Sequence, residues 1–259
     1  MRAIFTIAFR EWRTLFQSPL AWTLLAVLFA ISAYLFNSMI HYYNQLQMQI
    51  RMSGYGGDQI QELPFTEVAI SPMLGNTAII LLLIMPMITM RLIADEKRRD
   101  TWPALACSPL SPMQIILGKY LGLLLFLLVT VLLLSLLPLS IMPYASPDMG
   151  QVISGFLGLF LLAASFGAVG LAASSSTDNP IVASVSTFGI LLGLWIISWM
   201  GGEISGSAGA IFSYLSLIDH YQPFLSGVIS STDLFYFILL SVAGLLFARQ
   251  RLMAERING

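Results

Sequence analysis

Residues that could perform catalysis are few in this chain, and the clearest pair is Asp219-His220. A histidine next to a carboxylate could act as a general base, which makes a hydrolase one hypothesis for this pair. Adjacent residues on a helix point in divergent directions, however, and no nucleophile stands in a strand-turn-helix pattern. The alternative interpretation is structural, namely a helix cap and a satisfied polar pair.

Metal and nucleotide sites find no support in the sequence. The chain has one cysteine, Cys107, and two histidines, His41 and His220, and these form no cluster with metal-ligand spacing. A P-loop ends in Gly-Lys-Ser/Thr, whereas neither Lys97 nor Lys119 is followed by Ser or Thr. We therefore predict no catalytic residue, metal or cofactor in this chain. If ATP drives the protein, a partner must bind it.

The elements that must position these residues are membrane spans. Hydrophobic residues make up 57% of the 259 residues and charged residues only 10%, with a mean hydropathy of +0.83, whereas soluble domains have about 25% charged residues. The net charge of -1 gives no reason to expect a nucleic acid partner. A span needs about 20 apolar residues. We predict an all-α fold, one transmembrane domain over residues 1–259, with spans at 19–40, 73–91, 115–140, 152–172, 181–200 and a short sixth at 232–248.

The basic residues predict the orientation of the spans, because Lys and Arg are retained in cytoplasmic segments near span ends. With both termini in the cytoplasm, every Lys and Arg except Arg51 falls on the cytoplasmic side. Lys119 lies one turn inside the third span, where we expect its side chain to extend to the lipid headgroups. No span carries a charge near its centre, which argues against proton-coupled or ion-coupled transport. The acids of the external segments are Asp58, Glu62, Glu67, Asp148, Glu203, Asp219 and Asp233.

Residues 1–18 have the pattern of an amphipathic helix that lies in the membrane interface. Two roles remain open for this helix, a plain membrane-surface anchor or a docking site for a partner, with Phe5, Trp12, Arg13 and Phe16 as its candidate residues. The apolar side chains that fall largely on one face are Ile4, Phe5, Ala8, Trp12, Leu15 and Phe16, and the polar ones elsewhere are Arg2, Arg10, Arg13 and Gln17.

Three loops complete the prediction. The cytoplasmic loop 94–112 carries charges of both signs, a short apolar turn and then Ser111-Pro112, so it can form a compact helix parallel to the membrane. A solvated run of charges is the simpler alternative. Outside, 41–71 is expected to be a polar loop. The external loop 201–231 contains an apolar stretch at 210–218 that is too short to span and fits an interfacial or partly re-entrant helix.

Several short motifs, in their order along the chain, resemble one family. The run from Arg91-Leu-Ile-Ala-Asp-Glu-Lys-Arg-Arg-Asp to Thr101, with Ser108-Pro-Leu-Ser-Pro112 and Ile116-Leu-Gly-Lys119, resembles the loop between spans two and three of ABC-2 type transporter permeases. The motifs Pro86-Met-Ile-Thr-Met-Arg91, Asn179-Pro-Ile-Val-Ala183 and Leu215-Ser-Leu-Ile-Asp-His220 are most similar to gliding-motility-type members of that family. The chain departs from the family at Asp100 to Trp102, where Gly-Thr-Ile or Gly-Thr-Leu is more usual.

The resemblance implies a permease subunit whose cytoplasmic loop is a coupling helix for a separate ATPase. Two copies of that ATP-binding subunit would hold ATP and Mg, and a second permease, the same chain in a homodimer or a homologous one, would complete the transporter. A periplasmic or accessory membrane subunit is a further candidate partner. The coupling contacts implied are Glu96, Lys97, Arg98, Arg99, Asp100, Thr101 and Trp102, with the N-terminal helix docking beside them.

Export across the bacterial inner membrane is the direction we expect, because nothing in the chain resembles a dock for a periplasmic binding protein. The substrate stays open, as does the transmission of force instead of solute transport. Two other classes of function also stay open. One is a membrane scaffold or assembly factor without transport, and the other is an intramembrane hydrolase that uses Asp219 and His220.

Overall fold

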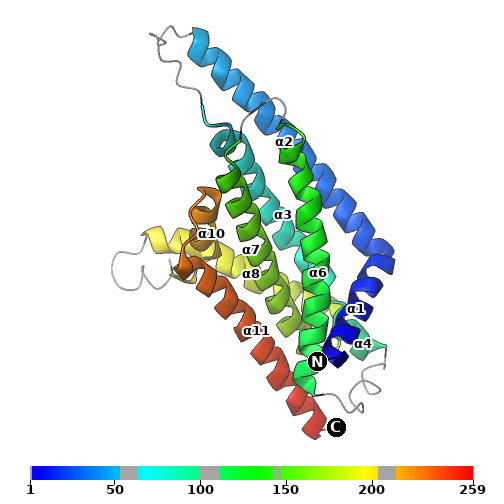
Figure 1. Cartoon of the computed structure of the whole chain (residues 1–259). Coiled ribbons are helices and arrows are strands. Elements are labelled where there is room, and N and C mark those ends of the chain that lie inside the picture. The colour runs from blue at the N-terminus through cyan, green and yellow to red at the C-terminus, as the bar shows by residue number, and fades with distance from the viewer. Residues whose placement is uncertain are drawn as a thin grey trace.

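The computed structural model describes residues 2–52, 63–99, 111–142, 145, 147–203 and 214–258, and every described element is a helix. The six long helices form a bundle, which α1 and α4 flank at one end (Figure 1). In chain order the elements are α1 (Arg2–Gln17), α2 (Pro19–Met52), the π-helical turn η1 (Thr66–Ile70), α3 (Ser71–Thr89), α4 (Ala94–Arg98), α6 (Pro112–Leu139), α7 (Met149–Ser175), α8 (Pro180–Glu203), α10 (Leu217–Leu225) and α11 (Ser231–Asn258).

Six helical stretches in the described part of the chain are long and apolar enough to cross a bilayer, one for each predicted span. The prediction of an all-α membrane protein with six spans is therefore confirmed for these residues. The sixth span, expected to be short, lies in a helix of 28 residues that also includes the basic tail. The stretches are Pro19–Met52, Thr66–Arg98, Pro112–Leu139, Met149–Ser175, Pro180–Ser198 and Ser231–Glu255.

The prediction of a loop at 41–71 is wrong at both ends of this segment, because both ends are helical. Helix α2 continues without a break to Met52, because the polar residues after Ile40 include neither Gly nor Pro and the glutamines among them are good helix formers. At the other end, η1 and the first turn of α3 are helical. Residues 53–62, the middle of the predicted loop, lie outside the described residues.

Helix α7 forms the centre of the bundle and packs against α3, α6, α8, α10 and α11. Most of its apolar stretch is buried (Figure 1). Its sequence explains this position, since Gly, Ala and Ser predominate and small side chains let neighbouring helices approach closely. The central helix thus gives a fixed frame against which the short helices at both ends are placed.

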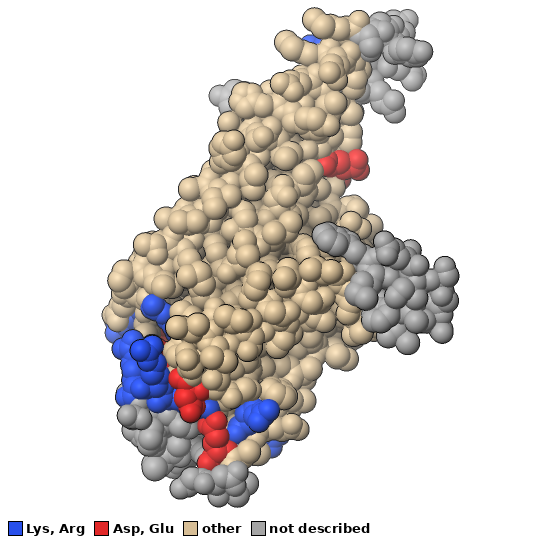
Figure 2. Space-filling view, turned by 180° about the vertical axis from the view of Figure 1, so that it is seen from behind, with Lys and Arg blue, Asp and Glu red and all other residues tan. Residues whose placement is uncertain are grey.

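The two ends of the bundle differ in charge. Helices α1 and α4 and the last turns of α11 lie at one end, and α10 and the end of α2 lie toward the other (Figure 1). Lys and Arg gather with a few acids over the first of these ends (Figure 2). We call it the basic end, and the opposite one the far end. This distribution is the one from which the cytoplasmic orientation was inferred, and that orientation stays a prediction.

A short helix lies in segment 201–231, which was predicted to be external, but it begins later than the apolar stretch 210–218 that predicted it. Helix α10 begins at Leu217, where the Ser216 side chain caps it by accepting a hydrogen bond from the backbone N–H of Asp219. Its buried side chains Tyr221 and Phe224 face the bundle, where α10 packs on α7 and α8. Residues 210–213 lie outside the described residues, so a re-entrant path stays a prediction.

Candidate functional site

The candidate site begins where α1 packs on α6 at the basic end. Gly122 of α6 faces α1, and a Cβ atom placed there would lie 2.7 Å from Cβ of Glu11 and 2.8 Å from the backbone oxygen of Ala8. Only a glycine allows the two backbones to come this close. Ile7 and Ala8, which lie against glycines of α6, are buried, and Glu11 is buried with them.

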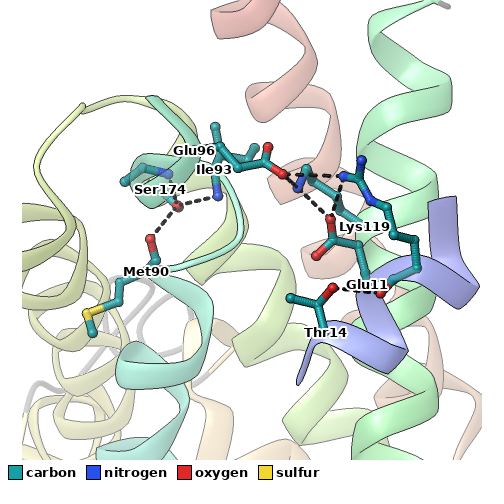
Figure 3. Close-up of polar contacts among 9 residues, drawn as sticks. Glu11, Thr14, Met90, Ile93, Glu96, Lys119 and Ser174 are labelled. Carbon is teal, nitrogen blue, oxygen red and sulfur yellow. Dashed lines mark hydrogen bonds and ion pairs between the residues drawn. The ribbon is translucent and has the colours of Figure 1, made fainter. Parts of the chain in front are cut away.

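Lys119 lies next to Glu11, and its side chain is 0% exposed. Its Nζ atom lies 2.8 Å from Oε1 of Glu11 and 2.8 Å from Oε1 of Glu96 (Figure 3). The guanidinium group of Arg10 also approaches these two oxygens, at 3.1 and 3.4 Å respectively. We call Arg10, Glu11, Glu96 and Lys119 the charge cluster. The expectation that Lys119 extends to the headgroups is wrong, because two carboxylates compensate its burial inside the protein.

The charge cluster joins three elements that are distant in sequence. Arg10 and Glu11 come from α1, Glu96 from α4 and Lys119 from α6, and the two positive and two negative charges balance. Removing a charge from water costs free energy, so each buried charge depends on its partners for compensation. Helix α4 is therefore joined by ion pairs to the helix of the third span and to the N-terminal helix.

Ser174 of α7 fixes the start of α4. Its Oγ atom accepts hydrogen bonds from the backbone N–H groups of Ile93 at 3.2 Å and Ala94 at 2.9 Å, and its hydroxyl donates to the carbonyl oxygen of Met90 at 3.2 Å (Figure 3). The residue at the N-cap position of α4, Ile93, has no side chain that could cap the helix. A serine from the central helix thus does the work of an N-cap residue.

Lys97 connects α4 to the C-terminal helix. Its ammonium group, almost fully buried, forms an ion pair with Glu255 of α11 and donates a hydrogen bond to the carbonyl oxygen of Ser175 at 2.8 Å. A second acid, the exposed Asp178 between α7 and α8, lies 3.6 Å away. Helix α4 is therefore bonded to α6 on one side and to α11 on another.

The seven residues predicted as coupling contacts separate into groups. Glu96 and Lys97 face the interior of this chain, whereas Arg98 and Arg99 are exposed at the basic end. Asp100, Thr101 and Trp102 lie outside the described residues. The structure therefore brings Glu96 and Lys97 into contact with the bundle and leaves Arg98 and Arg99 accessible to a partner.

The N-terminal residues divide between two faces of α1. The residues predicted for one apolar face differ in exposure, because Ala8 is buried against Gly122 of α6 whereas Phe5 is 69% exposed. Trp12 and Phe16 are half-buried and pack edge to face with ring centroids 5.4 Å apart. Arg13 is exposed, with its guanidinium carbon 5.8 Å from the ring centroid of Phe9. An exposed aromatic face beside basic residues is typical of a helix at a membrane interface.

At the far end, the side chains of Asp219 and His220 have different hydrogen-bond partners. The Nδ1 atom of His220 lies 2.6 Å from Oδ1 of Asp233 in α11, and its Nε2 atom lies 3.0 Å from the carbonyl oxygen of Tyr214. Asp219 instead accepts a hydrogen bond from the hydroxyl of Ser198 in α8 at 2.8 Å. The structural interpretation of the two residues fits this geometry, since each holds α10 to a different span.

Sequence reasoning missed four residues that complete these contacts: Glu11, Ser174, Asp233 and Glu255. Glu11 carried a usable signal, because it is the single acid of α1 and lies between Ala8 and Leu15 on the buried face. A lone acid and a lone lysine on two otherwise apolar faces suggest a pair. Ser174 carried no signal, since nothing in the sequence distinguishes it from its neighbours Ser175 and Ser176.

Comparison with known proteins supplies a family. Residues 64–248 match the model of a family described as ABC-2 family transporter protein. The matched range includes α4, α6, α7, α8 and α10 and ends inside α11. No match was found among curated proteins.

Proposed function

Because the chain belongs to the ABC-2 family of transporter proteins, we propose that it is a gliding-motility-type permease subunit in which α4 transmits ATP-driven motion to the spans. A separate ATPase subunit binds and hydrolyses ATP with Mg. Its closure pushes on the basic end and shifts the bundle between two arrangements.

The observation that supports this proposal is the set of bonds that holds α4. The charge cluster bonds it to α1 and α6, Ser174 to α7, and Lys97 to α11. A five-residue helix has too little surface to stay in place by apolar packing alone. Specific polar bonds to several spans make it suited to pass a displacement on to all of them together.

The residues that we assign to the contact with the ATPase are those whose side chains are exposed at the basic end, together with the residues that follow them in the sequence. Arg98 and Arg99 are the described residues of the 94–112 loop that present charge outward, and Asp100, Thr101 and Trp102 continue the same segment. Exposed charges set the orientation of docking, and a tryptophan can fill a pocket on the partner. Glu96 and Lys97 are reassigned from docking to transmission within this chain.

The assembly we propose contains two ATPase copies and two permeases, identical or homologous, in the bacterial inner membrane. The basic end faces the cytoplasm and transport is outward, of a solute or as mechanical work, with or without a periplasmic or accessory membrane subunit. An intramembrane hydrolase at Asp219 and His220 is not favoured, because both ring nitrogens of His220 already lie within hydrogen-bonding distance of protein acceptors.

The test uses the permease co-expressed with its ATPase, in nanodiscs, with spin labels at Met48 and Phe235, which are exposed toward the far end. Arg98→Ala combined with Arg99→Ala should reduce co-purification of the ATPase at least several-fold. Glu96→Gln should leave co-purification intact and abolish the ATP-dependent change in the distance between the labels. Arg51→Ala, on an exposed residue at the far end, is the matched control.

Two results would contradict the proposal. One is an unchanged label response in Glu96→Gln, which would show that α4 does not transmit motion through the charge cluster. The other is the absence of any ATP-dependent response in the unmodified complex although the ATPase is bound, which would favour a scaffold or assembly factor.

A further inference from the structure

A cavity of about 560 Å³ lies at the basic end between α1, α2, α3 and α4. Pockets of this size accommodate small molecules or parts of lipids. One wall is apolar and includes Leu15, Ile88 and Leu92, while Arg91 and Ser18 contribute polar groups. The cavity therefore presents both apolar and polar groups to a ligand.

Three arginines and three acids line the cavity, but Lys119, which lies outside the lining, also pairs with two of these acids. Glu11 and Glu96 are engaged with Lys119 and Arg10 in the charge cluster, and the remaining acid, Asp95, lies 3.0 Å from the guanidinium group of Arg99. Within the described part of the chain, none of the ion pairs includes Arg91. Its guanidinium group donates a hydrogen bond from Nη1 to the hydroxyl oxygen of Ser18 at 2.9 Å. Among the described residues, no ion pair thus compensates the positive charge that this half-buried guanidinium group brings to the cavity.

Two aromatic side chains, Phe16 and Trp22, lie next to cavity-lining residues at the α1–α2 junction. The cavity is lined by Leu15, Ser18 and Ala21. Phe16 and Trp22 are their neighbours in the sequence, and the two rings are in edge-to-face contact with centroids 5.7 Å apart. Trp22 is largely exposed and donates from its indole N–H to the carbonyl oxygen of Phe16 at 2.7 Å. Aromatic rings of this kind mark the headgroup layer of a bilayer. The cavity is therefore placed where phosphate groups of lipids are abundant.

An apolar wall continues from the cavity toward the bilayer interior. Ile88 also lines a narrow apolar cleft between α2, α3 and α6, together with Leu24, Leu28, Ile84 and Phe126. A ligand bound at Arg91 therefore has polar contacts at one end and hydrocarbon contacts at the other. This combination distinguishes a lipid from a free anion.

We propose that the cavity binds a resident phospholipid whose phosphate group contacts the Arg91 guanidinium and the Ser18 hydroxyl. A guanidinium group can form two parallel hydrogen bonds to a phosphate, which balances the charge of Arg91. The acyl chains follow the wall at Ile88 into the membrane. The lipid joins the α1–α2 junction to the end of α3, directly before α4.

The experiment measures lipid binding to the full chain in detergent by native mass spectrometry, with phosphatidylglycerol as the probe. Arg91→Gln should raise the apparent Kd at least about tenfold, which corresponds to about 1.4 kcal/mol. Arg13→Gln, which removes an exposed arginine at the same end but outside the cavity, should change it less than twofold. Ser18→Ala should give a smaller loss than Arg91→Gln and serves as the second variant if that protein does not fold.

Two further arms separate a lipid from other sources of phosphate. Diacylglycerol, which lacks the phosphate, should not bind at this site, and excess inorganic phosphate should not displace phosphatidylglycerol. Equal binding by Arg91→Gln and the unmodified chain would overturn the proposal. Displacement by inorganic phosphate would also overturn it, in favour of a site for free phosphate.

Discussion

The ammonium group of Lys119 lies 2.8 Å from a carboxylate oxygen of Glu11, and 108 residues separate the two in the sequence. The pair joins the N-terminal helix to the third span at a point where both side chains are buried. Burial of charges costs free energy that only the partner charge can offset, so the loss of one partner is worse than the loss of both. The same logic extends to Glu96, which shares Lys119 with Glu11.

Replacement of Lys119 by methionine should destabilise the protein strongly. The change leaves the carboxylates of Glu11 and Glu96 with Arg10, which is half exposed, as the remaining cation of the charge cluster, and we expect the free energy of unfolding to fall by about 3 kcal/mol. Thermal unfolding in detergent measures the effect. The double variant Lys119→Met with Glu11→Gln should recover part of the loss, and a single variant as stable as the unmodified chain would refute the role of the charge cluster.

Replacement of Ser174 by alanine should loosen the start of α4 while leaving the bundle folded. The backbone N–H groups of Ile93 and Ala94 lose their acceptor, a change that costs about 1 kcal/mol for a typical N-cap. We expect faster amide hydrogen exchange in α4. Ser165→Ala is the matched control, because Ser165 is buried in the same helix and its hydroxyl donates only to Leu162 of its own helix. Equal exchange in both variants would count against the cap.

The six spans were predictable because each depends on a local property. A run of about 20 apolar residues must become a helix in a bilayer, whatever its neighbours are. Helix α6 begins at Pro112, three residues before the predicted span 115–140, and the Ser111 side chain caps it by accepting a hydrogen bond from the backbone N–H of Gln114 at 3.2 Å. The end of α2 was missed because polar residues at a membrane surface are compatible with helix and loop alike.

The contacts of the candidate site were less predictable because they depend on pairs of residues. Lys119 read alone is a lysine near a span end, and its burial follows only from the approach of Glu11 and Glu96. His220 read alone pairs with its neighbour Asp219, yet its partner is Asp233, 13 residues away on another helix. A sequence pattern within one segment cannot reveal which residue of another segment it will contact. The charged residues therefore indicated where the site lies, but not which side chains pair with each other.

Replacement of Asp233 by asparagine should release α10 from α11. His220 loses its charged partner, and because both groups are nearly buried we expect the midpoint of thermal unfolding to fall by several degrees. Hydrogen exchange in α10 should become faster at the same time. Asp219→Asn is the comparison, since its amide oxygen can still accept the hydrogen bond from Ser198 and the predicted change is small. A larger effect at Asp219 than at Asp233 would reverse this assignment.

Replacement of Gly122 by alanine should displace α1 from the bundle. The added Cβ atom would lie 2.8 Å from the backbone oxygen of Ala8, which cannot move unless the helix moves. We expect a lower midpoint of thermal unfolding and faster hydrogen exchange throughout α1, because the shift also lengthens the Glu11–Lys119 contact. The expected result depends on the approach of two backbones and not on the helical preference of alanine.

Gly189→Ala separates the steric effect of the added methyl group from the helical preference of alanine. Gly189 lies within α8 with no atom within 4 Å of an added Cβ, so alanine there meets no steric obstacle. Alanine favours a helix over glycine by about 0.5–1 kcal/mol, and this variant should be as stable as the unmodified chain or slightly more so. If Gly122→Ala were equally well tolerated, α1 would not be held against α6 at this glycine, and the buried position of Glu11 beside Lys119 would lose its structural basis.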